Sequence, residues 1–155
     1  MLWCKLAVTP LEVGLKLYGH NESSSIDVTL YRQLVGSLIY LTTTQPNIYF
    51  TVSMVLIFMA EPNELHWKVA KRISRYLHGT IGYGLVYRSI EDFKLIGYTD
   101  SDRAGCMDDM KSTSGYSFSM GSTTIAWSTN KQPTIFLSTT KAEYKAETTT
   151  TCEAI

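Results

Sequence analysis

The sequence predicts an α+β protein in two parts: three helices up to about residue 79, then strands and one terminal helix. Between residues 27 and 78, apolar residues recur at spacings of three and four, which is the helical period. After Gly79 the apolar runs become short and rich in β-branched and aromatic residues, a pattern typical of strands. Helical character returns from about Thr139. The boundary between the two parts is expected between Gly79 and Lys94.

The first part opens with an irregular stretch. Residues 1–26 contain Pro10, Gly14 and a polar run with three serines, so we expect a loop or linker there. Asp27 is placed to cap the first helix, because its carboxylate can accept from the free amides of the first turn. The apolar face of that helix comprises Tyr31, Leu34, Val35, Leu38 and Leu41.

Two further helices are expected. Pro46 suits the first turn of the second, which should run to about Met59. Asn63 can cap the third, from Glu64 to His78, and Gly79 should end it in the left-handed conformation. One side of the third helix should be buried, namely His66, Val69, Ala70, Ile73 and Leu77. The other side carries four cations, called here the basic stripe: Lys68, Lys71, Arg72 and Arg75.

The basic stripe has two interpretations. Aligned cations suit binding to a nucleic-acid backbone without recognition of its sequence. The same pattern is also the ordinary solvated face of an amphipathic surface helix, which is the interpretation that composition alone favours.

The second part is expected to contain strands at residues 83–88, 94–99, 114–120 and 123–128. The last two should form a hairpin through Gly121 and Ser122. The terminal helix starts near Thr139. The run Thr148–Thr151 should weaken it, because β-branched residues lose side-chain freedom in a helix.

Composition narrows the class of protein. Of the 155 residues, 14 are basic and 14 acidic, so no net charge draws the chain to nucleic acid or membrane. The three cysteines are scattered without CxxC spacing, which argues against a disulfide framework and a zinc site. No apolar run reaches the ~18 residues that cross a bilayer, and no signal peptide is visible. We therefore expect an intracellular protein, cytoplasmic or nuclear and not secreted, with no membrane partner.

The candidate chemistry lies at Asp100, which follows an apolar strand, and at Glu143, on the terminal helix. Magnesium prefers hard oxygen ligands and takes only one or two carboxylates from one segment, so a distant second carboxylate would extend such a site. A metal held there would activate water and stabilise charge on a phosphate. By itself, however, an Asp after a strand is more often a turn former or a helix cap.

A series of short motifs follows along the chain: Tyr31–Leu41, Glu64–Lys68, Ala70–Ile73, Arg75–Thr80, Gly97–Asp102, Lys111–Tyr116, Lys131–Pro133, Leu137–Thr140 and Ala142–Tyr144. In this order and at this spacing, they resemble the Pol polyproteins of copia-type (Ty1/copia) retrotransposons. The resemblance covers nearly the whole chain.

The resemblance implies the end of a reverse transcriptase that runs into the start of a ribonuclease H domain. Residues 27–88 would be a helical region like the thumb and connection. Residues 92–155 would be the first three strands and first helix of a ribonuclease H-like domain, which has a mixed sheet and would be truncated here. Asp100 and Glu143 match the first two catalytic carboxylates and ligands of a two-metal magnesium site. Nucleic-acid binding is implied for Ser101, Asp102, Thr139 and Thr140, together with the basic stripe.

The implied partners are an RNA–DNA hybrid and the missing parts of the polyprotein. The sequence departs from the family pattern at Arg103 and Cys106, where the family has Trp and Asp, and at Lys141, where it has Glu. The family's remaining carboxylates are expected beyond Ile155. We therefore expect a fragment whose ancestral activity is magnesium-dependent cleavage of RNA in hybrids and which is inactive as an isolated chain. The alternative is a non-catalytic module that binds nucleic acid through the basic helix Lys68–Arg75 or binds another protein.

Overall fold

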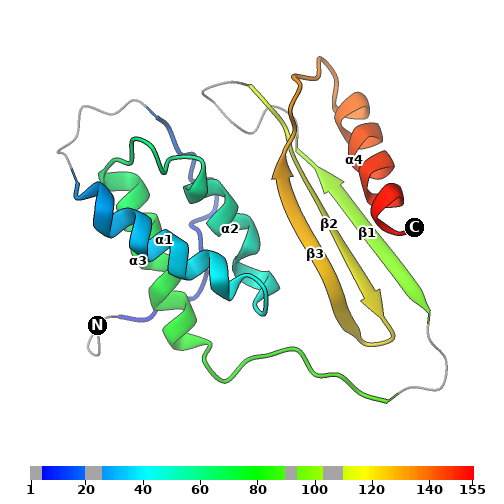
Figure 1. The fold of residues 1–155 in the computed structure, drawn as a ribbon, viewed down its shortest axis with the longest axis horizontal. Coiled ribbons are helices and arrows are strands. Elements are labelled where there is room, and N and C mark those ends of the chain that lie inside the picture. Colours follow the sequence, from blue (N-terminus) through cyan, green and yellow to red (C-terminus); the bar gives the residue numbers. More distant parts are fainter. Residues whose placement is uncertain (1–4, 20–25, 90–93, 103–109) are drawn as a thin grey trace. The chain divides into compact units, whose positions relative to one another are not determined.

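The computed structural model describes residues 5–19, 26–89, 94–102 and 110–155. Its elements are α1 (Val28–Leu41), α2 (Pro46–Leu56), α3 (Glu64–Gly79), β1 (Leu95–Ser101), β2 (Thr113–Met120), β3 (Thr123–Lys131) and α4 (Thr139–Glu153). The chain divides into two compact units, residues 1–84 with the first three helices and residues 85–155 with the sheet and α4 (Figure 1). The predicted α+β class and the order of its helices are confirmed.

Local capping explains where the helices of the first unit begin. The Asp27 carboxylate accepts from the amides of Thr29 and Leu30 at 2.8 and 3.1 Å, as its N-cap role predicts. Asn63 and His66 cap the start of α3 together. The Asn63 Oδ1 accepts from the backbone amide of His66, and the backbone amide of Asn63 donates to His66 Nδ1. Both predicted N-caps are confirmed.

The ends of two helices differ from the expectation. The helix α2 stops at Leu56 rather than near Met59, since the amides of Phe58 and Met59 bond three residues back in tighter turns. The helix α3 includes Gly79 and is capped by Thr80, whose φ of −118° is not left-handed. The left-handed stop expected at Gly79 is therefore wrong.

The first unit is built around one apolar core. The predicted buried side of α3 is confirmed, with His66, Val69, Ala70 and Ile73 buried and Leu77 packed against the core. Residues 5–19 contain no helix or strand, as expected for an irregular stretch. They are not a free linker, however, because Leu17 is buried in the core, with Leu11 and Leu15 packed against it. Burial of these leucines stabilises the segment against the helices.

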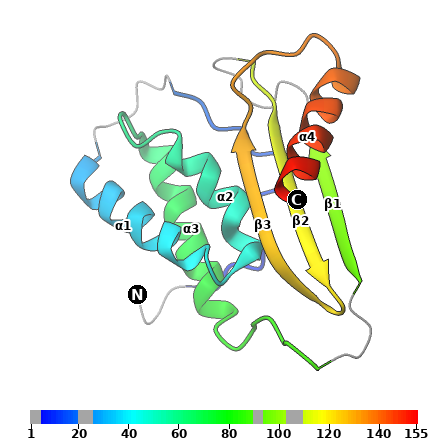
Figure 2. The ribbon, with the colours of Figure 1, turned by 45° about the vertical axis from the view of Figure 1, so that its right-hand side comes forward.

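The second unit is an antiparallel sheet in the order β1-β2-β3, with α4 against β1 and β2 (Figures 1 and 2). The hairpin between β2 and β3 is confirmed, and Gly121 supplies the positive φ of 64° at its turn. The buried face of α4 consists of Ala142, Ala146 and Thr150, which recur every four residues.

The strand expected at residues 83–88 is wrong. This stretch pairs with no strand of the described residues, and Tyr83 and Tyr87 are exposed. Its side chains have strand propensity, but a strand also needs a neighbour to satisfy its backbone groups. One polar contact ties it down, from the Thr123 hydroxyl to the Val86 carbonyl. The strand expected at 94–99 runs instead from Leu95 to Ser101.

The threonine run does not end α4, which continues to Glu153. Each hydroxyl of the run donates to the carbonyl one turn earlier, at 2.8 or 2.9 Å. These bonds give the β-branched side chains local partners that compensate for part of their low helix propensity. No helix of the described residues has the length and apolarity to cross a membrane.

Candidate acidic site and basic stripe

The end of β1 and the start of α4 are held together by the side chain of Gln132. This side chain is 4% exposed, and its Nε2 donates to Ser101 Oγ at 3.3 Å and to the Ala142 carbonyl at 3.1 Å. Ser101 directly follows Asp100, and Ala142 directly precedes Glu143. The structure therefore brings together the two backbone segments that carry the predicted carboxylates.

The two carboxylates leave these segments in different directions. Thr99 Oγ1 bonds to Thr150 of α4 at 2.9 Å, and Ser101 Oγ bonds to Gln132, so both of these β1 residues face the helix. Side chains alternate along a strand, which puts Asp100 on the opposite face of the sheet. There its Oδ1 accepts from the Ser101 amide at 2.9 Å. Glu143 is exposed on α4.

Magnesium suits carboxylate oxygens, but the described residues do not provide a site for it. They contain no group of three or more His, Cys, Asp or Glu side chains that could hold a metal ion. A two-metal site needs more carboxylate charge than Asp100 and Glu143 supply. The ligand type fits magnesium, and the arrangement of the described residues does not.

The other predicted residues of this region have mainly local roles. The Asp102 carboxylate accepts from the Thr113 amide at 2.5 Å and so fixes the start of β2. Thr139 and Thr140 form the exposed first turn of α4, after the N-cap Ser138, whose hydroxyl accepts from the Lys141 amide. Binding of nucleic acid by these residues stays a prediction.

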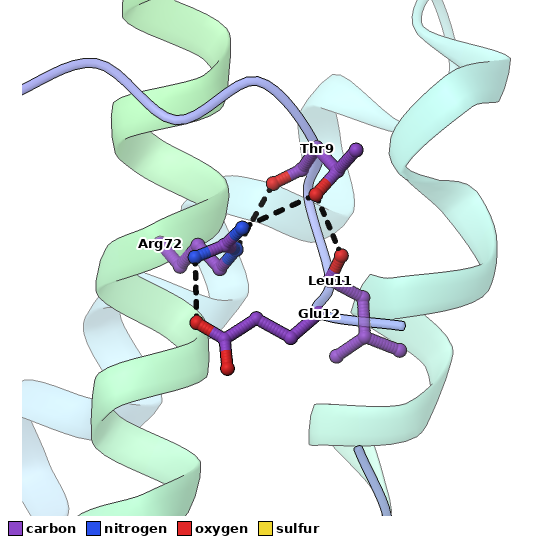
Figure 3. Close-up of polar contacts among 4 residues, drawn as sticks. All are labelled: Thr9, Leu11, Glu12 and Arg72. Atoms are coloured by element: carbon purple, nitrogen blue, oxygen red, sulfur yellow. Dashed lines mark hydrogen bonds and ion pairs between the residues drawn. The ribbon is translucent and has the colours of Figure 1, made fainter. Parts of the chain in front are cut away.

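Three of the four cations of the basic stripe, Lys68, Lys71 and Arg72, contact partners within their own unit. Figure 3 shows Arg72 reaching the N-terminal segment, where it donates to Glu12 Oε1 at 2.8 Å, to the Thr9 carbonyl at 3.1 Å and to Thr9 Oγ1 at 3.2 Å. Lys68 forms an ion pair with Glu64 at 2.9 Å, and Lys71 Nζ lies 5.2 Å from the centroid of the Trp67 ring. These contacts favour a structural role for Arg72.

Two contacts were not anticipated from the sequence. The bonds from Arg72 to Thr9 and Glu12 join residues about 60 positions apart, and no local pattern signals them. The Gln132 contact had a possible signal, since this residue is the centre of the Lys131–Pro133 motif. A polar side chain that directly follows an apolar strand is a candidate for a buried hydrogen-bonding role.

The chain is a small α+β protein in which a three-helix unit precedes a unit of one sheet and one helix. The second unit carries the two candidate carboxylates, Asp100 on β1 and Glu143 on α4. The chain is 38% identical over 153 residues to the retrovirus-related Pol polyprotein from transposon RE2 of Arabidopsis thaliana, a match that covers 99% of this chain and 10% of that protein. It is 39% identical over 154 residues to the Pol polyprotein from transposon TNT 1-94 of Nicotiana tabacum, covering 95% of this chain and 12% of that protein. The chain belongs to the copia-type retrotransposon Pol polyprotein family.

A shorter relative matches over most of its own length. The chain is 38% identical over 126 residues to the secreted RxLR effector protein 161 of Plasmopara viticola, which covers 81% of this chain and 89% of that protein. By contrast, the chain spans only about a tenth of the length of the Pol polyproteins that it matches. No family model matches the chain. No solved structure matches it either.

Proposed function

We propose that the chain derives from the part of a Pol polyprotein where the reverse transcriptase ends and the ribonuclease H domain begins. The ancestral reaction would then be magnesium-dependent cleavage of RNA in RNA–DNA hybrids, with the hybrid and the other parts of the polyprotein as partners. Family membership supports this proposal, as does the order of three antiparallel strands followed by a helix.

One observation carries the proposal. The Gln132 side chain bonds to both Ser101 and Ala142, which are the neighbours of Asp100 and Glu143. Two acidic positions far apart in sequence thus lie on backbone segments that share one buried amide. In the complete polyprotein, Asp100 and Glu143 would be ligands for magnesium together with further carboxylates, which requires the end of β1 to turn the Asp100 side chain away from the sheet face opposite α4.

We further propose that the 155-residue chain by itself does not cleave the RNA of an RNA–DNA hybrid. Asp100 lies on the sheet face opposite α4, and the described residues contain no larger acidic group beside it. Two carboxylates supply too little negative charge for the two metal ions that stabilise an in-line displacement at phosphorus.

The test uses the RE2 polyprotein with its matched segment replaced by this chain, and measures magnesium-dependent cleavage of a labelled RNA–DNA hybrid. Asp100→Asn and Glu143→Gln should each lower the rate by at least ~100-fold, since even residues that only support metal ligands cost ~10–100-fold. Glu147→Gln is the matched control, because Glu147 is exposed on the same helix one turn later. The purified 155-residue chain should give no cleavage.

Two results would contradict the proposal. Full ribonuclease activity of the chimeric RE2 polyprotein with Asp100→Asn would remove the assignment of the ribonuclease site. Cleavage by the isolated chain that Asp100→Asn abolishes would overturn its inactivity.

The basic stripe is not favoured as a second function. Arg72 and Lys68 are paired with Glu12 and Glu64, and the Lys71 ammonium lies over an aromatic ring. A bound phosphate backbone would have to displace these partners before it gained the same cations.

A further inference from the structure

Gln132 is the buried amide at which three segments of the second unit meet. Its backbone amide donates to the carbonyl of Ser112, a fully buried residue, at 2.8 Å. Its side-chain Nε2 donates to Ser101 Oγ at the end of β1 and to the Ala142 carbonyl in the first turn of α4. One residue therefore connects the segment before β2, the end of β1 and the start of α4.

Chemistry fixes the orientation of this amide. The Ala142 carbonyl can only accept, so the NH₂ side of the Gln132 amide must face it. In this orientation Oε1 is buried, and no donor of the described residues reaches it. A buried acceptor without a partner disfavours the folded state, so stability alone gives a weak reason for this arrangement.

We propose that Gln132 is a positioning residue for the ribonuclease site, setting the separation between the strand that carries Asp100 and the helix turn that carries Glu143. This inference rests on the proposed function and adds a residue to it. Because Ser101 and Ala142 are sequence neighbours of the two carboxylates, neither carboxylate-bearing segment shifts without straining a bond to Gln132.

The other end of α4 has its own attachment. Thr150 Oγ1 bonds to Thr99 Oγ1 at 2.9 Å, two turns beyond Ala142. Loss of the Gln132 amide should therefore free the first turn of α4 while the later turns stay on the sheet. The expected effect is local to the turn that carries Glu143.

The test measures the separation directly in the 155-residue chain. Spin labels are placed at Asp100→Cys and Glu143→Cys after the native cysteines are replaced by serine, and their distance distribution is recorded by dipolar EPR. Hydrogen exchange is measured at the amides of residues 143–146 in chains with no label. Gln132→Met keeps the size of the side chain and removes both donors. Asn130→Leu is the matched control, because Asn130 is exposed near the end of β3, two residues before Gln132, and its side-chain amide donates to nearby Ser128.

Gln132→Met should broaden the distance distribution and speed exchange at residues 143–146 by at least ~10-fold, with the amides after Thr150 unchanged. Asn130→Leu should leave both measurements as in the parent chain. If Gln132→Met does not fold, Ser101→Ala removes one of the two acceptors and should give a smaller change in the same direction. An unchanged distance distribution in the folded variants would overturn the proposal.

Gln132→Glu provides a pH-dependent rescue that a merely space-filling role would not show. An ionised carboxylate only accepts, so it should repel the Ala142 carbonyl and broaden the distribution at neutral pH. A protonated carboxyl has one O–H that can donate to the Ala142 carbonyl, so the distribution should narrow as pH falls through the pKa of the introduced carboxyl, which burial raises above the ordinary value of about 4.3. The parent chain serves as the reference at each pH. A distribution that stays broad at acid pH while the parent chain remains narrow would overturn the proposal.

The outcomes separate this inference from the proposed function. The distances and exchange rates are measured without any cleavage reaction, whereas the proposed function is judged by cleavage in the chimeric RE2 polyprotein. In that polyprotein, Gln132→Met should lower kcat for cleavage by ~10–100-fold and leave KM for the RNA–DNA hybrid unchanged. Normal kcat, with Asp100→Asn inactive, would show that Gln132 is structural only and would overturn the positioning role.

Discussion

Replacing Tyr31 by phenylalanine tests how far one buried hydrogen bond stabilises the helical unit. Tyr31 is fully buried on α1, and its hydroxyl donates to the Val55 carbonyl on α2 at 2.7 Å. Tyr31→Phe keeps the ring in the core and removes the donor. The Val55 carbonyl retains a bond from the Phe58 amide, so we expect a loss of about 1 kcal/mol in the free energy of unfolding at neutral pH.

The same variant should behave differently at high pH. Burial raises the pKa of the Tyr31 phenol above its ordinary value of 10.0, because the charged phenolate is poorly solvated in the core. The folded state then holds this proton more tightly than the unfolded state. The corresponding stability is complete below about pH 10 and is lost as pH rises toward the folded pKa, at up to about 1.4 kcal/mol per pH unit. The parent chain should therefore lose its higher free energy of unfolding at about pH 11, and Tyr31→Phe should be the more stable protein above that pH.

Urea unfolding followed by far-ultraviolet circular dichroism, from pH 7 to pH 12, checks both parts of this prediction. Tyr40→Phe is the control, since Tyr40 is 78% exposed on the same helix and should change stability at pH 7 by less than ~0.5 kcal/mol. A stability difference between Tyr31→Phe and the parent chain that stays constant over this pH range would refute the reasoning.

Three further predictions follow from single contacts. Arg72→Ala should release the N-terminal segment and speed limited proteolysis within residues 5–19. Lys68→Ala, which removes an exposed ion pair within α3, should not change this rate of proteolysis. Equal rates of proteolysis in the two variants would contradict the role of Arg72. Gly97→Ala should destabilise the second unit by about 1–3 kcal/mol in thermal unfolding, because its Cβ would lie 2.8 Å from the Phe118 ring, and Phe118→Leu in the same chain should recover part of the loss. Thr150→Val should cost about 1 kcal/mol by removing the part-buried bond to Thr99, while Thr149→Val, at an exposed hydroxyl of the same run, should cost less. Equal losses in denaturant unfolding would argue against the Thr150–Thr99 contact.

Most of the helical structure was predictable because its signals are local. An Asp or Asn before an apolar periodic run caps a helix through bonds within three residues, as Asp27 and Asn63 do. The strand expected at residues 83–88 failed for the opposite reason, since strand pairing depends on a distant partner and propensity alone does not supply one. The threonine run of α4 shows a third case, in which bonds to the preceding turn offset a low intrinsic propensity.

By itself, the sequence determined the α+β class, the helix starts and the motifs through which membership of the copia-type Pol family was recognised. Only the tertiary structure decided that Arg72 binds Glu12 and Thr9, and that Gln132 joins the neighbours of Asp100 and Glu143. It also decided that Asp100 lies on the sheet face opposite α4. The physical reason is range: caps and periodicity act within one or two turns of chain, whereas these contacts join residues that only packing brings together.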